Sequence, residues 1–178
     1  MKTQQEIVDY MNSKIDKLIP ALQNLVKTGE EVPPVVFLLF ESEGIDMVLR
    51  PMPQSHIFFA NNEMKDRLPA FIRSIRDALR EPDVDPELRN EELIGVMLVS
   101  DIFRANDTDI DPSKSVEDYV PPSERPDRIE AIMFSCHING HSFMRVYPYI
   151  RGEQIIFSDV EIIDNAGNEG RFAKLFPD

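Results

Sequence analysis

The sequence predicts an α+β fold, in which two main helices pack on one face of a mixed, largely antiparallel sheet of about six strands. Two segments of the chain repeat apolar residues every three or four positions, which is the spacing of a helix with one buried face. Short apolar runs rich in β-branched and aromatic residues are bounded by turn residues, which is typical of strands. The length of 178 residues fits a single domain spanning 1–178.

The first main helix is predicted over 3–28. Thr3 and Glu6 have the spacing of a capping box, and Gly29 is suited to end the helix. Pro20 interrupts the apolar pattern, so we expect either a kink or a second helix that begins near it. The second main helix is predicted over 63–80, with Pro69 in its first turn, where the missing N–H is tolerated.

The strands are predicted from apolar runs and turn residues. A hairpin is predicted over 35–50, and 56–60 is expected to add a short strand. The run 93–100 is the most uniformly apolar, so it should be the central strand. The polar segment 105–128 is predicted to be a long acidic loop. The remainder, 129–164, is predicted to be a three-strand meander with turns at 139–140 and 151–153.

Two short motifs lie within 93–134. The first, "VMLVSDIF", is an apolar strand that ends in Val-Ser-acid, and the second, "PPSERPDRIEAIMF", contains Pro-Ser-x-x-Pro-x-Arg-x-Glu before the next strand. This layout resembles that of uncharacterised bacterial and phage single-domain proteins, except that Phe103 stands where another aromatic residue such as Trp is usual. The resemblance implies no activity and supports only the single-domain interpretation.

Charge is the most uneven property of the chain. The net charge is −13, and residues 81–130 hold 15 acidic against 5 basic residues. This excess should repel nucleic acids and anionic membranes, and it should attract a basic protein surface. The start of the chain lacks the apolar core of a signal peptide, no apolar run is long enough for a membrane span, and there is one cysteine, so we expect a cytoplasmic protein. No phosphate-cradle or nucleophile-elbow motif occurs, so we expect no cofactor.

Cys136, His137 and His141 lie within six residues, at a hairpin turned by Asn139-Gly140. Side chains alternate between the two faces of a strand, so His137 should face away from Cys136 and His141. The two histidines therefore cannot bind one metal ion, and no CxxC or HExxH motif supplies further zinc ligands. A structural hairpin tip is the favoured interpretation; the alternative is a small hydrolase that uses these three side chains as weak catalytic candidates.

The acidic loop has part of the spacing of a calcium-binding loop. If Asp107 is position one, acidic residues stand at positions 1, 3, 5 and 12, where hard oxygen ligands converge on the ion. Pro112 occupies the position that needs Gly, and an aspartate replaces the bidentate Glu at position 12. A solvated surface is therefore favoured, and the weak calcium candidates are Asp107, Asp109, Asp111 and Asp118.

The sequence favours a non-catalytic protein-binding module that uses its acidic loop to bind a basic partner. A homodimer is a second expectation, because the final hairpin has more large apolar side chains than one buried face needs: Phe134, Phe143, Met144, Tyr147 and Tyr149. A weak nucleic-acid mimic and a calcium-binding protein are further alternatives. The expected partner-binding residues are the charged residues Asp101, Asp107, Asp109, Asp111, Glu117, Asp118, Glu124, Arg125 and Arg128.

Overall fold

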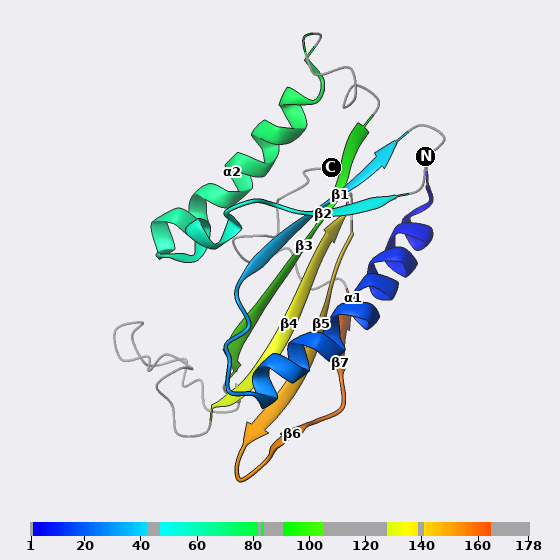
Figure 1. Ribbon diagram of the computed structural model, residues 1–178. Coiled ribbons are helices and arrows are strands. Elements are labelled where there is room, and N and C mark those ends of the chain that lie inside the picture. Colours follow the sequence, from blue (N-terminus) through cyan, green and yellow to red (C-terminus); the bar gives the residue numbers. More distant parts are fainter. Residues whose placement is uncertain are drawn as a thin grey trace, which may run out of the picture.

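A curled antiparallel sheet lies between two helices in the structure, a computed structural model (Figure 1). The structure describes residues 2–42, 47–81, 83, 91–104, 128–138 and 141–164. This confirms the predicted α+β class. In chain order the elements are α1 (Gln4–Lys27), β1 (Val35–Ser42), β2 (Val48–Pro51), the 3-10 helix η1 (Ser55–Phe59), α2 (Asn62–Ala78), β3 (Glu91–Arg104), β4 (Ile129–Ile138), β5 (His141–Arg151), β6 (Ile155–Phe157) and β7 (Glu161–Asp164).

The strands are ordered β2-β1-β3-β4-β5-β6, and every pairing between described strands is antiparallel. The expected central strand, β3, is indeed flanked by β1 and β4. β6 and β7 follow each other along the same side of β5, with Ile150 opposite Ile156 and Met144 opposite Ile163. The sheet therefore has two edges among the described strands: β2 on one side and the β6–β7 pair on the other.

The two helices cover opposite faces of the sheet (Figure 1). Leu39 and Met97 belong to the core under α1, whereas Leu38 and Val96, their neighbours in sequence, belong to the core under α2. The expectation that both helices pack on one face is therefore wrong. The physical reason is visible in β1 and β3, whose nearly continuous apolar runs are those of strands that are buried on both sides.

α1 begins at the predicted capping box. The amide of Glu6 donates to Thr3 Oγ1 at 3.3 Å, and the amide of Thr3 donates to Glu6 Oε2 at 2.7 Å. The helix runs through Pro20 to Lys27, so no second helix begins at the proline. Gly29 follows the end of the helix with a φ of 85°, a left-handed conformation that glycine adopts at little cost.

α2 and η1 differ from the prediction in detail. Asn61 caps α2 by accepting a hydrogen bond from the amide of Met64 at 2.9 Å, so Pro69 lies inside the helix and not in its first turn. Residues 56–60, expected to form a strand, instead belong mostly to η1, which follows Gln54 in a left-handed conformation (φ 56°). η1 and α2 together pack Phe58, Phe59, Leu68 and Ile72 against the sheet.

Candidate functional site

The hairpin tip has the geometry that the sequence predicts. Ile138 lies opposite His141 and His137 opposite Ser142, so His137 faces the side of α2 while Cys136 faces the side of α1. Cys136 is fully buried, and burial raises the pKa of its thiol. A thiol held in its protonated form is a poor nucleophile, and so the structure supports a structural role for Cys136.

The two histidines of the hairpin have separate partners. His137 is buried, and its Nε2 lies 2.9 Å from Ser135 Oγ. Burial lowers the pKa of His137 to about 4. His141, on the other face, places Nε2 3.2 Å from Asp164 Oδ1. The histidines are therefore not brought together, and in the described part of the chain no group of three His, Cys, Asp or Glu side chains could hold a metal ion.

The acidic segment is only partly covered by the structure. Asp101 lies in β3, and Arg128 lies just before β4 with its guanidinium carbon 5.3 Å from the centre of the Phe103 ring. The calcium candidates and the remaining expected partner-binding residues fall outside the described residues, so these interpretations stay predictions: Asp107, Asp109, Asp111, Glu117, Asp118, Glu124 and Arg125.

Asp101 joins three distant parts of the chain on the side of α1. Its Oδ2 accepts the amide of Val32 at 3.0 Å, and its Oδ1 accepts the hydroxyl of Tyr149 at 3.2 Å. Burial raises the pKa of Asp101, against the opposing effect of these two hydrogen bonds. The carboxylate thereby fixes the loop before β1 to β3 and to β5.

The hydrogen bonds continue from Tyr149 to a second carboxylate. Arg151 donates from Nη2 to the hydroxyl of Tyr149 at 3.3 Å and from Nε to Glu130 Oε2 at 2.6 Å. Burial, followed by the charge of Asp101, raises the pKa of Tyr149. We call Asp101, Tyr149, Arg151 and Glu130 the carboxylate–tyrosine–arginine network. Sequence reasoning singled out Asp101 as a surface contact and missed Tyr149 and Arg151, because only the strand register brings them together.

The network is built to hold strands together. A cavity of about 380 Å³ opens beside Asp101, and its other polar residues are Lys65 and Ser100, while the remaining lining is apolar. The hydrogen bonds of Asp101 go to Val32 and Tyr149, and these contacts fix the loop before β1 and the strand β5 to β3. We assign the network a structural role.

Replacing Tyr149 by Phe should therefore lower the free energy of unfolding by about 1–2 kcal/mol, because a buried hydroxyl that joins Asp101 to Arg151 is lost. Urea unfolding followed by far-ultraviolet circular dichroism would measure the change. Tyr10→Phe is a matched control. Tyr10 lies in α1 and is only partly buried, so the loss of its hydroxyl should change the free energy of unfolding less. Equal stability of Tyr149→Phe and the unmodified protein would remove the assigned role.

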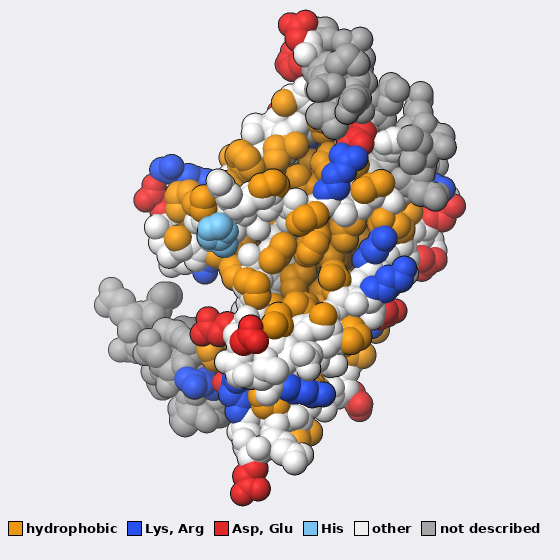
Figure 2. Space-filling view, viewed as in Figure 1, with side chains coloured by type: hydrophobic (Ala, Val, Ile, Leu, Met, Phe, Trp, Pro, Cys, Tyr) orange, Lys and Arg blue, Asp and Glu red, His pale blue; other side chains and the backbone are white. Residues whose placement is uncertain are grey.

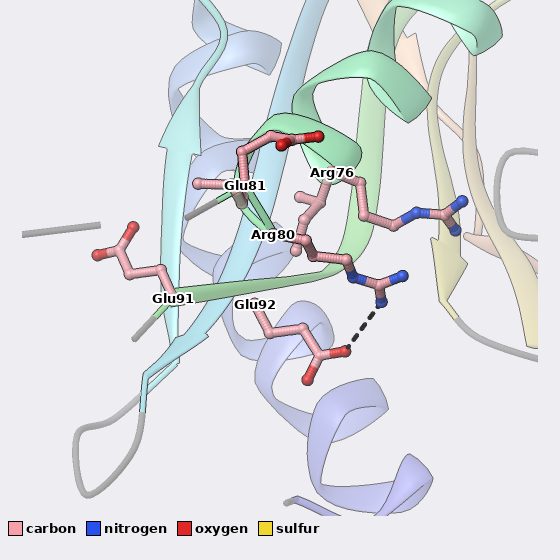
Figure 3. Close-up of a pocket in the computed structure, with 7 residues that line it drawn as sticks. Arg76, Arg80, Glu81, Glu91 and Glu92 are labelled. Carbon is pink, nitrogen blue, oxygen red and sulfur yellow. Dashed lines mark ion pairs between the residues drawn. The ribbon is translucent and has the colours of Figure 1, made fainter. Parts of the chain in front are cut away.

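A larger cavity, of about 540 Å³, lies between the end of α2 and the start of β3 (Figure 3). Arg76 and Arg80 point to the same side of it, and Arg80 Nη2 lies 3.7 Å from Glu92 Oε1. Glu91 points away and binds Arg50 through two contacts of 2.5 and 2.6 Å. Glu81 also lines the cavity. Because Glu91 is already paired with Arg50, two arginines remain with two glutamates, Glu81 and Glu92, and the cavity offers no excess of either charge that would select a small ionic ligand.

Apolar side chains reach the surface in two regions. Figure 2 shows hydrophobic side chains gathered between α1 and α2, over β1 and β2. η1 and α2 add Ile57 and Phe71, each 43% exposed. The second region is the β5–β7 side of the sheet, where Ile150, Ile156 and Ile162 are 64%, 66% and 66% exposed.

The final hairpin does not have the exposed apolar face that we expected from the sequence. Four of the five large side chains assigned to that surface are buried under α1, so they form core and not a spare face: Phe134, Phe143, Tyr147 and Tyr149. The fifth, Met144, is partly buried. The exposed apolar residues of the C-terminal strands are isoleucines at the sheet edge instead, and no sequence pattern distinguished them from buried ones.

Comparisons with known protein families, curated proteins and solved structures found no match. The resemblance of 93–134 to bacterial and phage proteins therefore stays a prediction. Neither helix in the described part of the chain combines the length and apolar character that crossing a membrane requires.

Proposed function

We propose that this protein is a non-catalytic protein-binding module whose partner presents a basic surface. The observation that supports this most is the composition of the sheet edge at 152–164, which holds four acidic residues and no basic one. Within the same segment Ile156 and Ile162 are two-thirds exposed. An apolar surface rimmed by polar and mostly acidic side chains is typical of a protein-interaction site.

The charge around this edge reinforces the proposal. The nearest arginines in β5 already have acidic partners: Arg145 lies 2.8 Å from Asp16, and Arg151 lies 2.6 Å from Glu130. These two arginines therefore do little to offset the acidic residues of the edge. Lys27 of α1 is a cation that does reach it, with Nζ 5.9 Å from the centre of the Phe157 ring. The chain as a whole carries −13, mostly within 81–130, and this field would attract a basic partner over a distance of about a Debye length, roughly 8–10 Å.

The hydrolase alternative at the hairpin tip has less support. A catalytic Cys or His must be reachable by substrate and held in a reactive protonation state. Cys136 is fully buried with a raised pKa, and His137 is buried with a lowered pKa on the opposite face. His141 lies beside Asp164, on the face opposite to His137.

A pull-down from lysate of the source organism, at low and high salt, tests the proposed function. We expect a basic protein to be retained at about 50 mM salt and released at about 500 mM, because screening weakens attraction between exposed charges. The double variant Glu153→Lys/Asp159→Lys should retain much less of it. The control Asp9→Lys/Glu31→Lys makes the same change in net charge on α1 and its following loop, and should retain more. The proposal would be contradicted if the same amount of the basic protein were retained at both salt concentrations and by the edge variant.

A further inference from the structure

We infer that the β6–β7 edge binds an extended basic segment of the partner as an additional β-strand. This rests on the proposed protein-binding function and specifies how the partner is held. In such strand addition, backbone hydrogen bonds supply affinity and the side chains supply selectivity. Three features support it: outward-facing backbone amides, exposed isoleucines beside them, and the acidic character of the edge.

The backbone amides of β6 alternate in direction. The amide of Ser158 donates to the carbonyl of Pro148 at 2.9 Å, which shows that Pro148 directs its carbonyl toward β6. Because residues of an antiparallel pair alternate between bonded and non-bonded positions, Ile156 also bonds to β5, opposite Ile150. Ile155 and Phe157, at the positions between, therefore direct their N–H and C=O groups outward.

The same alternation extends to β7. Even-numbered residues of β5 direct their backbone groups toward this edge, so Met144 bonds to Ile163, and Ile162 faces outward. Among the described residues no strand pairs with the outer side of β6 or β7. The outward amides of Ile155, Phe157 and Ile162 are thus placed to bind an added strand.

The opposite edge of the sheet, β2, is less suited to strand addition. The amide of Met52 donates to the carbonyl of Val36 at 2.7 Å, so Leu49 and Pro51 are the residues of β2 that face outward. Pro51 has no N–H, and Pro53 follows shortly after. Proline on a short edge strand is a common protection against strand addition. The β6–β7 edge has no proline between 152 and 164, so among the described strands it is the edge better suited to strand addition.

The side chains at this edge define what the added strand carries. Ile150 and Ile156 lie opposite each other, and Ile163 lies on the same side of the sheet, away from α1. Ile150 and Ile156 form an exposed apolar pair, and Ile163 adds a less exposed apolar side chain farther along β5, so both positions would cover apolar side chains of the incoming strand. Of the acidic residues of 152–164, Glu161 lies on the side of Ile163 and Asp164 lies on the side of α1, so basic residues of the incoming strand would meet an acidic residue on either side. A second copy of the same edge would place four acidic residues against four, which disfavours a homodimer formed this way.

Synthetic peptides of about ten residues, the length of the edge, can test the inference on the full-length protein. The probe alternates lysine with valine or isoleucine, and its affinity is measured by fluorescence anisotropy. Two further versions carry N-methyl groups on one or the other set of alternate amides, because only one set of a bound strand faces the protein. We expect one methylated peptide to bind about as well as the parent and the other about tenfold or more weakly. A peptide with glutamate in place of lysine should not bind.

Two variants of the protein locate the site. Ile162→Ala removes an exposed side chain, whereas Ile162→Pro removes the outward amide as well, without removing a hydrogen bond to β5. Pro should therefore weaken peptide binding more than Ala does, and circular dichroism would verify that both variants fold. Hydrogen exchange should show protection of the amides of Ile155, Phe157 and Ile162 when the peptide binds.

The inference is overturned if both methylated peptides bind equally, if protection appears at β2 instead, or if the protein dimerises through Ile162 in sedimentation experiments. The proposed function fails separately, if no salt-sensitive partner is retained from lysate. A retained basic partner that binds Ile162→Pro and Ile162→Ala equally would leave the function standing and remove strand addition.

Discussion

Lowering the pH from about 7 to about 4 should decrease the free energy of unfolding by about 3 kcal/mol through His137 alone. Burial lowers the pKa of this histidine from an ordinary value of 6.5 to about 4 in the folded protein. Between these values the unfolded chain binds more protons at this position than the folded chain does. The contribution of His137 is therefore fully present above pH 6.5 and is lost as the pH falls toward 4.

Urea unfolding at intervals between pH 4 and pH 7.5 would measure this loss, with the variant His137→Gln as reference. Glutamine keeps a group that can hydrogen-bond to Ser135 Oγ but does not titrate. The difference in stability between the unmodified protein and the variant should shrink or reverse as the pH falls. His56→Gln is the control, because it makes the same substitution at an exposed histidine of η1 and leaves His137 in place. An unchanged pH dependence in His137→Gln would contradict the burial of a neutral imidazole.

The features that sequence reasoning predicted correctly are those set by neighbouring residues. Thr3 and Glu6 cap each other across three positions, so their pairing in α1 depends on little else. Asn139-Gly140 predicted a tight hairpin, and this determined the register of His137 and His141 on opposite faces. The predicted bounds of the two main helices agree with α1 and α2 to within about two residues at each end, which is ordinary variation for helix ends.

The features that sequence reasoning missed depend on contacts between distant segments. α1 and α2 have similar apolar stripes, and nothing in a stripe says which face of the sheet it will cover. The carboxylate–tyrosine–arginine network joins positions 101, 130, 149 and 151 through two strand registers. The last predicted strand is divided at residues 158–160, so β6 and β7 lie one after the other along β5.

The exposure of the isoleucines illustrates the same limit. Ile155 is partly buried in the core under α1, whereas Ile156, the next residue, is 66% exposed. Both are β-branched residues in one short strand. Their difference in exposure arises because α1 covers one face of the sheet at β6, whereas α2, on the other face, covers β1 and β3. The acidic character of 152–164, in contrast, is readable from the sequence alone.

Replacing Gly95 by Val should lower the free energy of unfolding by about 1–3 kcal/mol, because β3 has no room for a side chain at this position. A Cβ atom built on Gly95 would lie 2.9 Å from Ile138 Cγ2, 2.9 Å from Met11 Cε and 3.2 Å from the carbonyl oxygen of His137. Two of these atoms belong to β4, and the third belongs to α1. Gly95 is therefore a position where both the helix and the hairpin lie close to β3, and the strand-favouring character of valine offsets only part of the clash.

Chemical unfolding of Gly95→Val would be compared with that of Gly152→Val, whose Cβ meets nothing closer than the carbonyl oxygen of Gln154 at 3.6 Å. The control should change stability by about 0.5 kcal/mol or less. The double variant Met11→Ala/Gly95→Val separates the two sources of the clash. If α1 is the main obstacle, the shortened side chain makes room, and the double variant loses less stability than the two single variants together. Additive losses of stability would instead place the clash at Ile138 and His137. If Gly95→Val left the free energy of unfolding unchanged, α1 would pack farther from β3 than the structure shows.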